Sequence, residues 1–456
     1  MGKSSVAVVG GGISGLSCAH VLSRRGFNVE VFEKERIAGG NARSELKNGY
    51  LIERGPNTFM GSATDILRLI ESLEISASMI ETDPHARRRF IVRNSILHEV
   101  PSSLSSFFTT SLLNPWEKFR LALEPFIPRG GRNGESAAEF FDRRFGKGAS
   151  RVLAGAFISG VFAGDPDMLS AEASFPLFYG FEKNHGSMIF GAFHHRRKKR
   201  ANLEGETQFI RKTGGGLYSM KNGLGQITER LFEILGERCH TSSQVQSIEI
   251  RKDRYIVCTS ERSYEAEYLV MATPPHEAAA LLGSISRSLA DLLGSIVMAP
   301  VAVLYLTYPA SAGRLDDGFG FLVPRNEGLR SLGVLYSSSL FSNRAPSGME
   351  LLTAFAGGML DAKAVDLSDR ELFDIATGDL GAITKKNLDL RLIEVKRYHG
   401  AIPQFKIGYL EMMKQIRFLV SKQKGLHLCG NYLKGVGMKD AVGSGFEAAN
   451  AISGGL

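Results

Sequence analysis

Short apolar runs separated by glycine open the chain. Residues 6–9 are apolar and lead into three consecutive glycines, a helix-like stretch then continues to Gly26, and a second apolar run stops at Glu33. Apolar runs of this length bounded by glycine are typical of buried strands. The pattern therefore predicts a strand, a tight turn, a helix and a second strand, in that order.

Similar blocks recur later in the chain. Residues 425–452 predict a short strand, a glycine-rich turn, a loop and a helix starting near Asp440. Residues 216–235 predict an amphipathic helix preceded by glycines, and residues 241–275 predict alternating strands. From about Arg93 to Arg211 the pattern changes to helical periods rich in Phe and Leu. Both ends of the chain thus contribute to one domain, and a helical module is inserted.

The glycines of the opening turn have the spacing of a dinucleotide-binding motif. Gly10, Gly12 and Gly15 form G-x-G-x-x-G directly after the predicted strand and directly before the predicted helix. The first glycine permits the turn, the second lets a pyrophosphate approach the backbone and the third allows close packing, while the helix N-terminus offers free amides. Glu33 then lies where an acid accepts from the ribose hydroxyls. Three glycines alone could mark a plain turn, but the whole context favours a dinucleotide.

FAD and NAD are both open until the next stretch, which carries Gly39, Gly40, Arg43 and Ser44 directly after the acidic strand end. This stretch resembles the amine-oxidase-like FAD superfamily, which implies FAD as the cofactor and places Arg43 near the pyrophosphate or the flavin. The alternative is that Arg43 is a solvated loop arginine without a role in cofactor binding. The resemblance implies cofactor contacts at Gly10, Gly12, Ile13, Ser14, Gly15, Glu33, Lys34, Gly39, Gly40, Arg43, Gly55, Pro56, Asn57, Val245, Ala272, Gly430, Asn431, Val436, Gly437 and Met438.

Val245 and Asn431 have a less certain part in cofactor binding than the other positions. Val245 is equally well explained as a plain core residue. Asn431 stands where many relatives carry an acid, so a ribityl or phosphate contact there would be neutral. At the C-terminal helix, the N-terminal amides near Val436, Gly437 and Met438 are expected to face the flavin pyrimidine edge.

Bulk composition limits the other possibilities. With 456 residues, 43% of them hydrophobic, the chain can bury a large core, and its length favours two or three domains. No stretch of eighteen residues is continuously apolar and a strand begins almost at once, so we expect neither a membrane span nor a cleavable signal, and a cytoplasmic protein. The four cysteines lack metal or disulfide spacing and are expected to be buried thiols.

The net charge of +8 favours anionic partners without choosing among them. No nucleic-acid-binding signature accompanies the charge, and no metal ligands occur at ligand spacing, because His194 and His195 are adjacent and alone. The basic run at residues 194–200 is interpreted first as a solvated loop, with contact to anionic lipid as the alternative.

Several longer stretches, including residues 52–60, 88–104, 139–176 and 318–346, together resemble the protoporphyrinogen oxidase family and its relative, coproporphyrinogen III oxidase. The likeness runs along essentially the whole chain. It implies an α/β plus α+β fold, with a Rossmann-like FAD-binding domain, a substrate domain with an antiparallel sheet and a helical membrane-binding domain. The expected boundaries are 1–60, 212–275 and 423–456 for the FAD domain, 61–92 and 276–422 for the substrate domain, and 93–211 for the membrane-binding domain, for which an ordinary helical core is the alternative.

The family's substrate residues can be carried over one at a time. Arg89 matches the arginine that pairs with a propionate, although Arg88 is adjacent and the register could slip by one. The resemblance implies that Leu322 and Leu335 clamp one pyrrole ring, and that Phe355 stacks on the opposite ring. Gly160 is expected to place a carbonyl near the substrate.

The resemblance implies a six-electron oxidation of protoporphyrinogen IX at flavin N5, with oxygen as acceptor and hydrogen peroxide as by-product. No strong protein base is expected, and no catalytic triad or carboxylate pair is evident, so the protein's part is orientation. Coproporphyrinogen III is the alternative substrate and needs extra cations, for which Arg93, Lys183 and Arg325 are candidates. More distant alternatives are another amine-oxidase-like enzyme or a non-catalytic FAD-binding protein. Expected partners are the porphyrinogen, oxygen and a peripheral membrane surface at the inner face of the cell membrane, with no nucleic acid; a homodimer is one candidate assembly.

Overall fold

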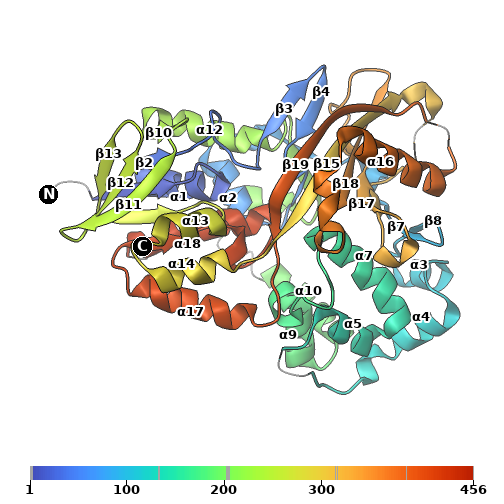
Figure 1. The fold of residues 1–456 in the computed structure, drawn as a ribbon. Coiled ribbons are helices and arrows are strands. Elements are labelled where there is room, and N and C mark those ends of the chain that lie inside the picture. Colours follow the sequence, from blue (N-terminus) through green and yellow to red (C-terminus); the bar gives the residue numbers. More distant parts are fainter. Residues whose placement is uncertain are drawn as a thin grey trace. The chain divides into compact units, whose positions relative to one another are not determined.

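The computed structural model describes residues 4–131, 134–201, 206–313, 315, 317–386 and 388–454. The chain divides into two compact units (Figure 1). The first unit comprises Met1–Glu81, Thr207–Val297 and Leu410–Leu456, and the second comprises Thr82–Glu206 and Met298–Tyr409. Each unit is therefore assembled from segments that are far apart in the sequence.

A parallel five-stranded sheet forms the centre of the first unit, with strand order β10-β2-β1-β14-β20. Its central strand has the apolar run that a strand buried on both faces requires, and the residues from Val6 to Val9 are almost completely buried. The strand that the C-terminal segment contributes lies at one edge. The strands are β1 (Ser5–Val9), β2 (Asn28–Phe32), β10 (Cys239–His240), β14 (Tyr268–Met271) and β20 (Leu426–Leu428).

Smaller sheets and the helices complete this unit. The smaller sheets are β11-β12-β13, β5-β9-β6 and the hairpin β3-β4. Their strands are β3 (Ser44–Lys47), β4 (Tyr50–Glu53), β5 (Phe59–Met60), β6 (Met79–Glu81), β9 (Leu217–Met220), β11 (Val245–Arg251), β12 (Arg254–Thr259) and β13 (Ser263–Ala266). The helices are α1 (Ile13–Arg24), α2 (Thr64–Ser72), α11 (Gln208–Thr213), α12 (Gly225–Leu235), α13 (Pro275–Leu282), α14 (Arg287–Gly294), α17 (Tyr409–Ser421, all but its first residue) and α18 (Met438–Ile452).

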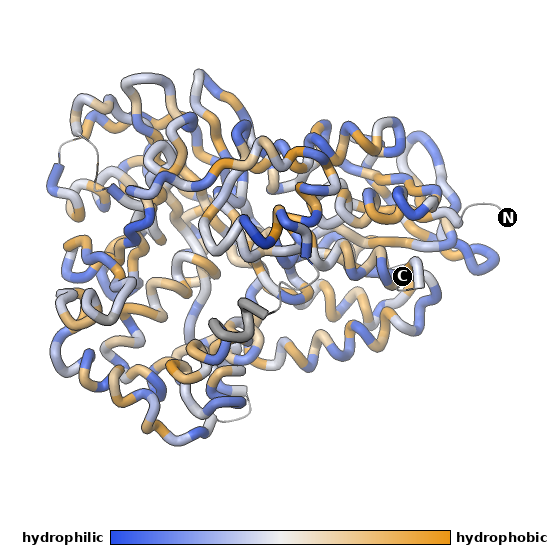
Figure 2. The backbone as a smooth tube through the Cα atoms, turned by 180° about the vertical axis from the view of Figure 1, so that it is seen from behind, coloured by the Kyte–Doolittle hydropathy of each residue, from blue (hydrophilic) through white to orange (hydrophobic). Residues whose placement is uncertain are grey.

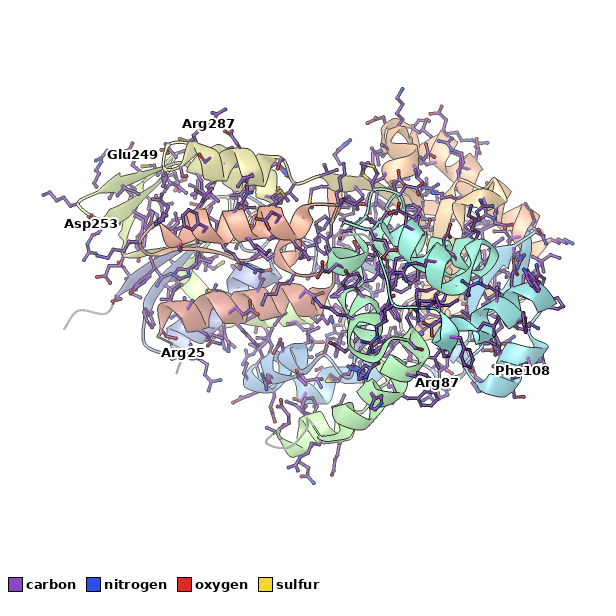
Figure 3. All side chains as sticks on the ribbon, turned by 90° about the horizontal axis from the view of Figure 1, so that it is seen from below. Arg25, Arg87, Phe108, Glu249, Asp253 and Arg287 are labelled. Atoms are coloured by element: carbon purple, nitrogen blue, oxygen red, sulfur yellow. The ribbon has the colours of Figure 1, made fainter. Side chains whose placement is uncertain are left out.

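Helices α1 and α18 join the two ends of the chain. A Cβ on Gly445 would lie 2.3 Å from the carbonyl oxygen of Ser14, so only glycine lets the helices approach this closely. At the other end of the contact, Arg25 donates to Asn450 Oδ1 at 2.8 Å and to the hydroxyl of Ser453; Figure 3 labels Arg25. The expectation that both ends of the chain build one domain is confirmed.

A seven-stranded sheet organises the second unit, with strand order β19-β15-β18-β17-β16-β7-β8. All neighbours are antiparallel except β7 and β16, which run parallel, so the expected antiparallel sheet contains one parallel pair. The reason is connectivity, because β7 and β16 come from distant segments and no hairpin joins them. The strands are β7 (Arg89–Arg93), β8 (Ile96–Glu99), β15 (Met298–Pro309), β16 (Gly320–Leu322), β17 (Ser331–Leu335), β18 (Met349–Gly357) and β19 (Arg391–Pro403).

The two faces of this sheet differ in their cover. One face forms the hydrophobic core of the unit, where Phe90, Phe321, Val334 and Ala354 pack with apolar side chains of α16 (Asp369–Thr384). We call this the core face. The residues that alternate with these point to the opposite face, because strand side chains have a period of two. We call that the open face, although helices cover part of it, since Ile91 is buried there among Leu112, Val152 and Ala156 and Leu322 packs on the same cluster.

Helices occupy most of the chain between β8 and residue 201. They are α3 (Leu104–Thr109), α4 (Pro115–Ala122), α5 (Ala137–Phe145), α6 (Lys147–Ala149), α7 (Gly155–Phe157), α8 (Ala171–Ser174), α9 (Pro176–His185) and α10 (Met188–Ala201), and α15 (Ser337–Leu340) follows β17. The hairpin β7–β8 extends past Arg93, so the helical pattern begins later than expected. Residues 194–201 are helical and continue α10 where a loop was expected, and the side chains of residues 196–201 lie outside the described part.

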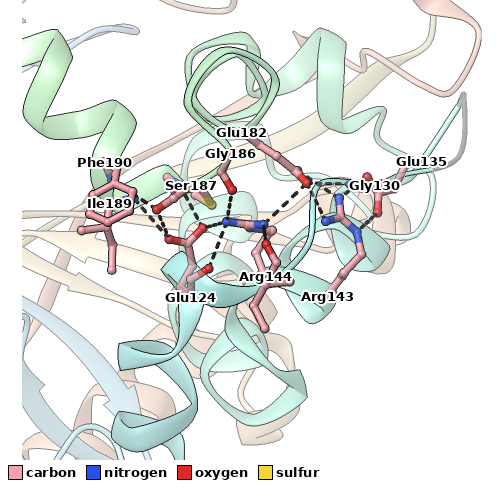
Figure 4. A network of polar contacts seen from close by, with 12 residues as sticks. Glu124, Gly130, Glu135, Arg143, Arg144, Glu182, Gly186, Ser187, Ile189 and Phe190 are labelled. Carbon is pink, nitrogen blue, oxygen red and sulfur yellow. Dashed lines mark hydrogen bonds and ion pairs between the residues drawn. The ribbon is translucent and has the colours of Figure 1, made fainter.

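A buried network of charges ties these helices together (Figure 4). Glu124 and Arg144 are both fully buried and hydrogen-bonded to each other, and the Glu124 carboxylate also accepts from Ser187 Oγ at 2.6 Å. Although burial alone would raise it, these bonds hold the pKa of Glu124 below its ordinary value. Beside them, Arg143 bonds to both Glu135 and Glu182. Each buried charge therefore has a partner, as burial demands.

Hydrophobic and polar positions interleave along both units (Figure 2). Among the helices that the structure describes, none is long and apolar enough to cross a membrane. Cys18, Cys239 and Cys429 are buried as expected, whereas Cys258 is only half-buried. All four are free thiols.

Candidate functional site

The N-terminus of α1 has open space in front of it. A Cβ built on Gly12, the residue that caps α1, would meet no atom within 4 Å. The helix's own hydrogen bonds begin when Leu16 N–H donates to Gly12 O at 2.9 Å, which leaves the amides of Ile13, Ser14 and Gly15 for a ligand. Such a helix start attracts an anion such as a pyrophosphate.

The other two motif glycines are required by packing. Gly10 has φ +109°, a conformation that favours glycine, and a Cβ there would lie 2.8 Å from the backbone of Ala272. A Cβ on Gly15 would lie 2.1 Å from Gly10 O. The roles predicted for these glycines, a tight turn and close packing of helix on strand, are confirmed, and the site wall formed by Ala272 lies beside them.

Glu33 follows the last residue of β2, and two backbone amides fix the position of its carboxylate. Its carboxylate accepts from Gly11 N–H through Oε2 and from Glu35 N–H through Oε1, each at 2.8 Å. The side chain is buried, and both oxygens keep lone pairs that can accept from ribose hydroxyls. The neighbouring Lys34 instead bonds to Glu277 at 2.6 Å, and this bond raises the pKa of Lys34.

The loop after β2 carries the second glycine pair and Arg43. Gly39 and Gly40 both have positive φ, and a Cβ on Gly40 would lie 3.1 Å from Gly12 Cα, so this loop lies against the open space at α1. The Nε of Arg43 is buried and has no hydrogen-bond partner within the described residues. A buried guanidinium nitrogen without an acceptor fits a site that an anionic group completes.

The sequence motif included Ser44, but sequence reasoning missed Glu53 and Thr228, which together with Ser44 hold this loop in place. Ser44 Oγ donates to Glu53 at 2.6 Å and accepts from Gly225 N–H at 2.8 Å, and Thr228 Oγ1 donates to Ala42 O at 2.7 Å. Glu53 is buried, which is a signal that sequence alone does not give. The N-terminus of α12 therefore anchors the loop that carries Arg43.

The remaining predicted cofactor residues divide into two groups. Gly55 packs on the Gly39–Arg43 loop, since a Cβ there would lie 2.5 Å from Asn41 O, and Asn57 donates to Gly55 O at 3.1 Å next to Pro56. Val245 is a buried residue at the start of β11, which agrees equally with the plain core interpretation.

The C-terminal group lies at α18. Gly430 has φ +150° and its N–H donates to Ser444 Oγ at 2.8 Å, which fixes the turn after β20 on this helix. Asn431 begins the turn that leads on to Val436. Helix α18 starts at Met438, with Gly437 as its cap, two residues before the predicted start. These residues fit the FAD that the sequence predicts.

The predicted substrate residues all lie in the second unit, and the strand register brings four of them to one face. Gly333 pairs with both Leu322 and Phe355, and Leu335 pairs with Gly320, which in turn pairs with Arg89. Paired residues share a face and so do residues two apart, so Arg89, Leu322, Leu335 and Phe355 all belong to the open face. The three apolar side chains are only partly buried, although Ile91, Val303 and Thr353 on the same face are buried.

Gly160 reaches the same place from a π-helical turn, Ile158–Phe162. A Cβ on Gly160 would lie 2.2 Å from Leu322 Cδ2, so its backbone packs directly on that side chain. Turns of this kind are often found at functional sites. The structure thus brings all five predicted substrate residues to one surface.

The register also separates the two adjacent arginines. Arg88 precedes β7, bonds to Glu99 at 2.8 Å and lies over the ring of Phe90, a core-face residue. Arg89 instead lies over the ring of Phe319, 5.7 Å from its centroid, and no carboxylate pairs with it in the part of the chain that the structure describes. Arg89 is therefore the available guanidinium of this pair.

Of the other predicted cations, two are engaged with protein groups and one is exposed. Arg93 pairs with Glu117 at 2.7 Å, and that bond raises the pKa of Arg93. Arg325 donates to the carbonyl oxygens of Gly357 and Arg330, and burial lowers the pKa of Arg325. Lys183 is exposed on α9. No cluster of three or more metal-ligating side chains occurs among the residues described.

Comparisons with known proteins agree with this geometry. The family model described as flavin containing amine oxidoreductase matches residues 13–453. The chain is 33% identical to protoporphyrinogen oxidase 1 of Arabidopsis thaliana chloroplasts, covering 98% of this chain and 87% of that protein. It is 27% identical to coproporphyrinogen III oxidase of Bacillus subtilis, covering 98% of both chains.

The fold is shared with a solved structure. A crystal structure from Exiguobacterium sp. 255-15, described as a candidate protoporphyrinogen oxidase, superposes with a TM-score of 0.82 at 24% identity and covers all of both chains. At that identity the likeness shows the fold alone. With the family match, it makes the chain a flavoprotein oxidoreductase of the amine-oxidase-like fold, with FAD as cofactor. The chain belongs to the flavin-containing amine oxidoreductases and, within them, to the protoporphyrinogen oxidase family.

Proposed function

We propose that this protein oxidises protoporphyrinogen IX to protoporphyrin IX in haem biosynthesis. The observation that carries the proposal is the open face of the second unit, where Leu322, Leu335 and Phe355 form an apolar strip. Beside it lies the guanidinium of Arg89, which no carboxylate of the described residues engages. A flat apolar ring with carboxylates at one edge matches that arrangement.

FAD, when bound, would supply an acceptor for one hydride, which carries two electrons, in each cycle, and a porphyrinogen needs three such cycles to become aromatic. Three molecules of oxygen become three of hydrogen peroxide, which balances the six hydrogens that the substrate loses. The chain's own residues have a different task. Leu322, Leu335 and Phe355 hold the ring plane, Arg89 fixes its rotation through a propionate, and the pyrrole N–H protons leave to water.

Orientation is sufficient for this chemistry in our proposal. The product gains aromatic stabilisation and the pyrroles are electron-rich, so the reaction does not call for a strong protein base. The rigid register of β16, β17 and β18 positions the clamp residues better than loops would. Gly160, packed on Leu322, closes the clamp from the helical side.

Coproporphyrinogen III is the second candidate substrate, because the chain matches the Bacillus subtilis coproporphyrinogen III oxidase over 98% of both chains. Four propionates would call for several free cations. Arg93 is paired with Glu117 and Arg325 with backbone carbonyls, so Lys183, exposed on α9, is the one candidate that the described residues do not engage, which favours the substrate with two propionates.

The deciding experiment compares the two substrates directly. Purified protein saturated with FAD is given protoporphyrinogen IX and coproporphyrinogen III under air, and the appearance of porphyrin fluorescence is recorded together with hydrogen peroxide. We expect a higher kcat/KM for protoporphyrinogen IX. A clear preference for coproporphyrinogen III would replace the proposed substrate, and absence of turnover with either would refute the oxidase proposal.

We also propose that the protein works in the cytoplasm as a peripheral protein on the inner face of the cell membrane. Exposed aromatic side chains on the helices of the second unit support this, among them Phe108, Trp116 and Phe126, at 69%, 71% and 81% exposure (Phe108 is labelled in Figure 3). Aromatic side chains exposed beside lysine and arginine suit a bilayer interface. A homodimer is one candidate assembly, which light scattering on the purified protein decides.

A further inference from the structure

Asp440 places a carboxylate at the N-terminus of α18. Its Oδ2 accepts from Gly437 N–H at 3.1 Å, while its own N–H donates to Gly437 O at 3.0 Å. A Cβ on Gly435 would lie 2.5 Å from the carboxylate carbon, and one on Gly437 would lie 3.1 Å from Oδ2. The two glycines therefore leave the space that the charge occupies, and the amides of Met438 and Lys439 stay free of helix bonds.

Contacts within the first unit show how far the N-terminus of α18 lies from the expected pyrophosphate site at α1. Helix α18 packs through Gly445 on Ser14, in the first turn of α1, where the pyrophosphate is expected. Met438 lies seven residues before Gly445, which is about 10 Å along the helix axis. The start of α18 is thus displaced from the pyrophosphate site by a distance that a ribityl chain can span, so the flavin end of FAD fits there.

The helix dipole and the Asp440 carboxylate have opposite effects on a negative charge at this helix end. The helix dipole and free amides favour the negative charge that a two-electron reduced flavin carries. The Asp440 carboxylate is only partly exposed, with 23% of its side-chain surface accessible, and disfavours that charge. The neighbouring cation, Lys439, has its Nζ 3.9 Å from Asp440 Oδ1, and its side chain is 66% exposed, so solvent screens its charge more.

We infer that Asp440 lowers the reduction potential of the bound flavin by offsetting the α18 dipole. A lower potential makes the reduced flavin a better donor to oxygen, and a substrate that becomes aromatic can drive reduction against it. The inference rests on seating the flavin end of FAD at α18. It does not rest on which porphyrinogen is oxidised.

The test is a redox titration of the FAD-loaded protein without substrate, followed by its visible absorbance. Asp440→Asn removes the charge but keeps an oxygen that can accept from Gly437 N–H. We expect the ratio of reduced to oxidised flavin at a fixed potential to rise about tenfold, an upward shift of about 30 mV for a two-electron couple. Asp440→Ser removes the same charge with a smaller acceptor and should shift the potential in the same direction.

Glu447→Gln is the matched control, because Glu447 lies on the same helix and pairs with Lys434 at 2.5 Å, away from the helix start. Its potential should equal that of the wild type. An unchanged or lowered potential in both Asp440 variants overturns the inference, and so does an equal shift in Glu447→Gln, which would reflect net charge alone. A purely structural role would lower the thermal unfolding temperature of Asp440→Ser without moving the potential. Failure of the proposed oxidase would instead appear in the turnover assay, which this titration does not use.

Discussion

Arg89 shows how one residue position can select the substrate. The guanidinium has no carboxylate partner among the described residues and belongs to the open face, whereas Arg88 is paired with Glu99. We predict that Arg89→Met lowers kcat/KM for protoporphyrinogen IX about 10- to 100-fold, because a hydrogen bond to a charged group contributes ~1.5–3 kcal/mol. Steady-state kinetics at equal FAD content measure the effect. Arg88→Met is the control and should change kcat/KM less than threefold; equal losses in both variants would remove the assignment.

A substitution at Gly12 tests whether FAD binds at the N-terminus of α1. A methyl group there meets no protein atom within 4 Å, so Gly12→Ala should fold with an unchanged unfolding temperature of the FAD-free protein. The methyl would still occupy the pyrophosphate's space, and overpacking of ~1–3 kcal/mol predicts FAD affinity about 10- to 100-fold lower. Fluorescence titration with FAD gives the dissociation constant. Gly283→Ala, whose Cβ has its closest atom at 3.7 Å, should bind FAD normally.

The predictions of the cofactor site and of the substrate surface rest on requirements of different range along the chain. The requirements at Gly10, Gly12, Gly15 and Glu33 are local, because one turn and one strand end create them. The choice between Arg88 and Arg89 depends on pairing with β16, which is far away in the sequence. No local pattern encodes that register.

At the scale of elements, a strand and a π-helical turn together form the clamp. A Cβ on Gly160 would collide with Leu322, whereas a Cβ on Gly155, in the same helical run, has its closest atom at 3.9 Å. We predict that Gly160→Ala displaces Leu322 and lowers kcat/KM about 10- to 100-fold, since small misplacements at a reacting centre are costly. Kinetics with FAD content measured in parallel would show it. Gly155→Ala should retain activity within twofold, and comparable losses in the two variants would mean that the helical run itself is sensitive.

The buried charge network acts between elements as well. Glu124 and Arg144 are fully buried, so Glu124→Gln removes the hydrogen-bonded carboxylate partner of Arg144 and leaves Glu182, 3.6 Å away and shared with Arg143. The free energy of unfolding should therefore fall by about 3–5 kcal/mol. Urea denaturation measures this, with the exposed Asp374→Asn as control, expected within ~0.5 kcal/mol of wild type. A value for Glu124→Gln close to the control would contradict a stabilising role.

The pH dependence of that difference has a definite sign. Because the pKa of Glu124 is lower in the folded protein than its ordinary value, the charged carboxylate stabilises the fold above that ordinary pKa. Protonation at lower pH removes the same charge as the substitution. The stability gap between wild type and Glu124→Gln should therefore be full at neutral pH and shrink as the pH falls through the lowered value.

Element boundaries show the limits of pattern reading. The strands and helices of the first unit follow glycine and apolar signals closely, and α18 starts at Met438, near the predicted Asp440. The network of Glu124, Arg143 and Arg144 gave no sequence signal, because its partners come from separate helices. Charged residues in helical stretches usually face solvent, so their burial could not be inferred from spacing.

At the scale of the whole molecule, the two compact units separate two tasks. The first carries the open helix start, Glu33 and Arg43, which suit a dinucleotide, and the second carries the apolar strip with Arg89. The basic net charge of +8 suits an acidic substrate and an anionic surface alike. Activity in solution therefore does not decide between a soluble and a membrane-bound enzyme, and a binding measurement is required.

Vesicle binding tests the proposed membrane contact. Trp116 and Phe126 are 71% and 81% exposed, and inserting each side chain into a bilayer interface could contribute up to ~1.5–3 kcal/mol. We predict that the double variant Trp116→Ser with Phe126→Ser loses at least about tenfold in affinity for vesicles containing anionic lipid, measured by co-sedimentation, while its FAD content stays normal. Leu46→Ser is the matched control, since Leu46 is 76% exposed on β3 of the first unit and should not alter binding.

If the wild type stays in the supernatant with both anionic and neutral vesicles, the exposed aromatic residues have another role and the peripheral membrane proposal is wrong. If it binds anionic vesicles and both variants bind equally well, the contact is electrostatic and these helices do not make it.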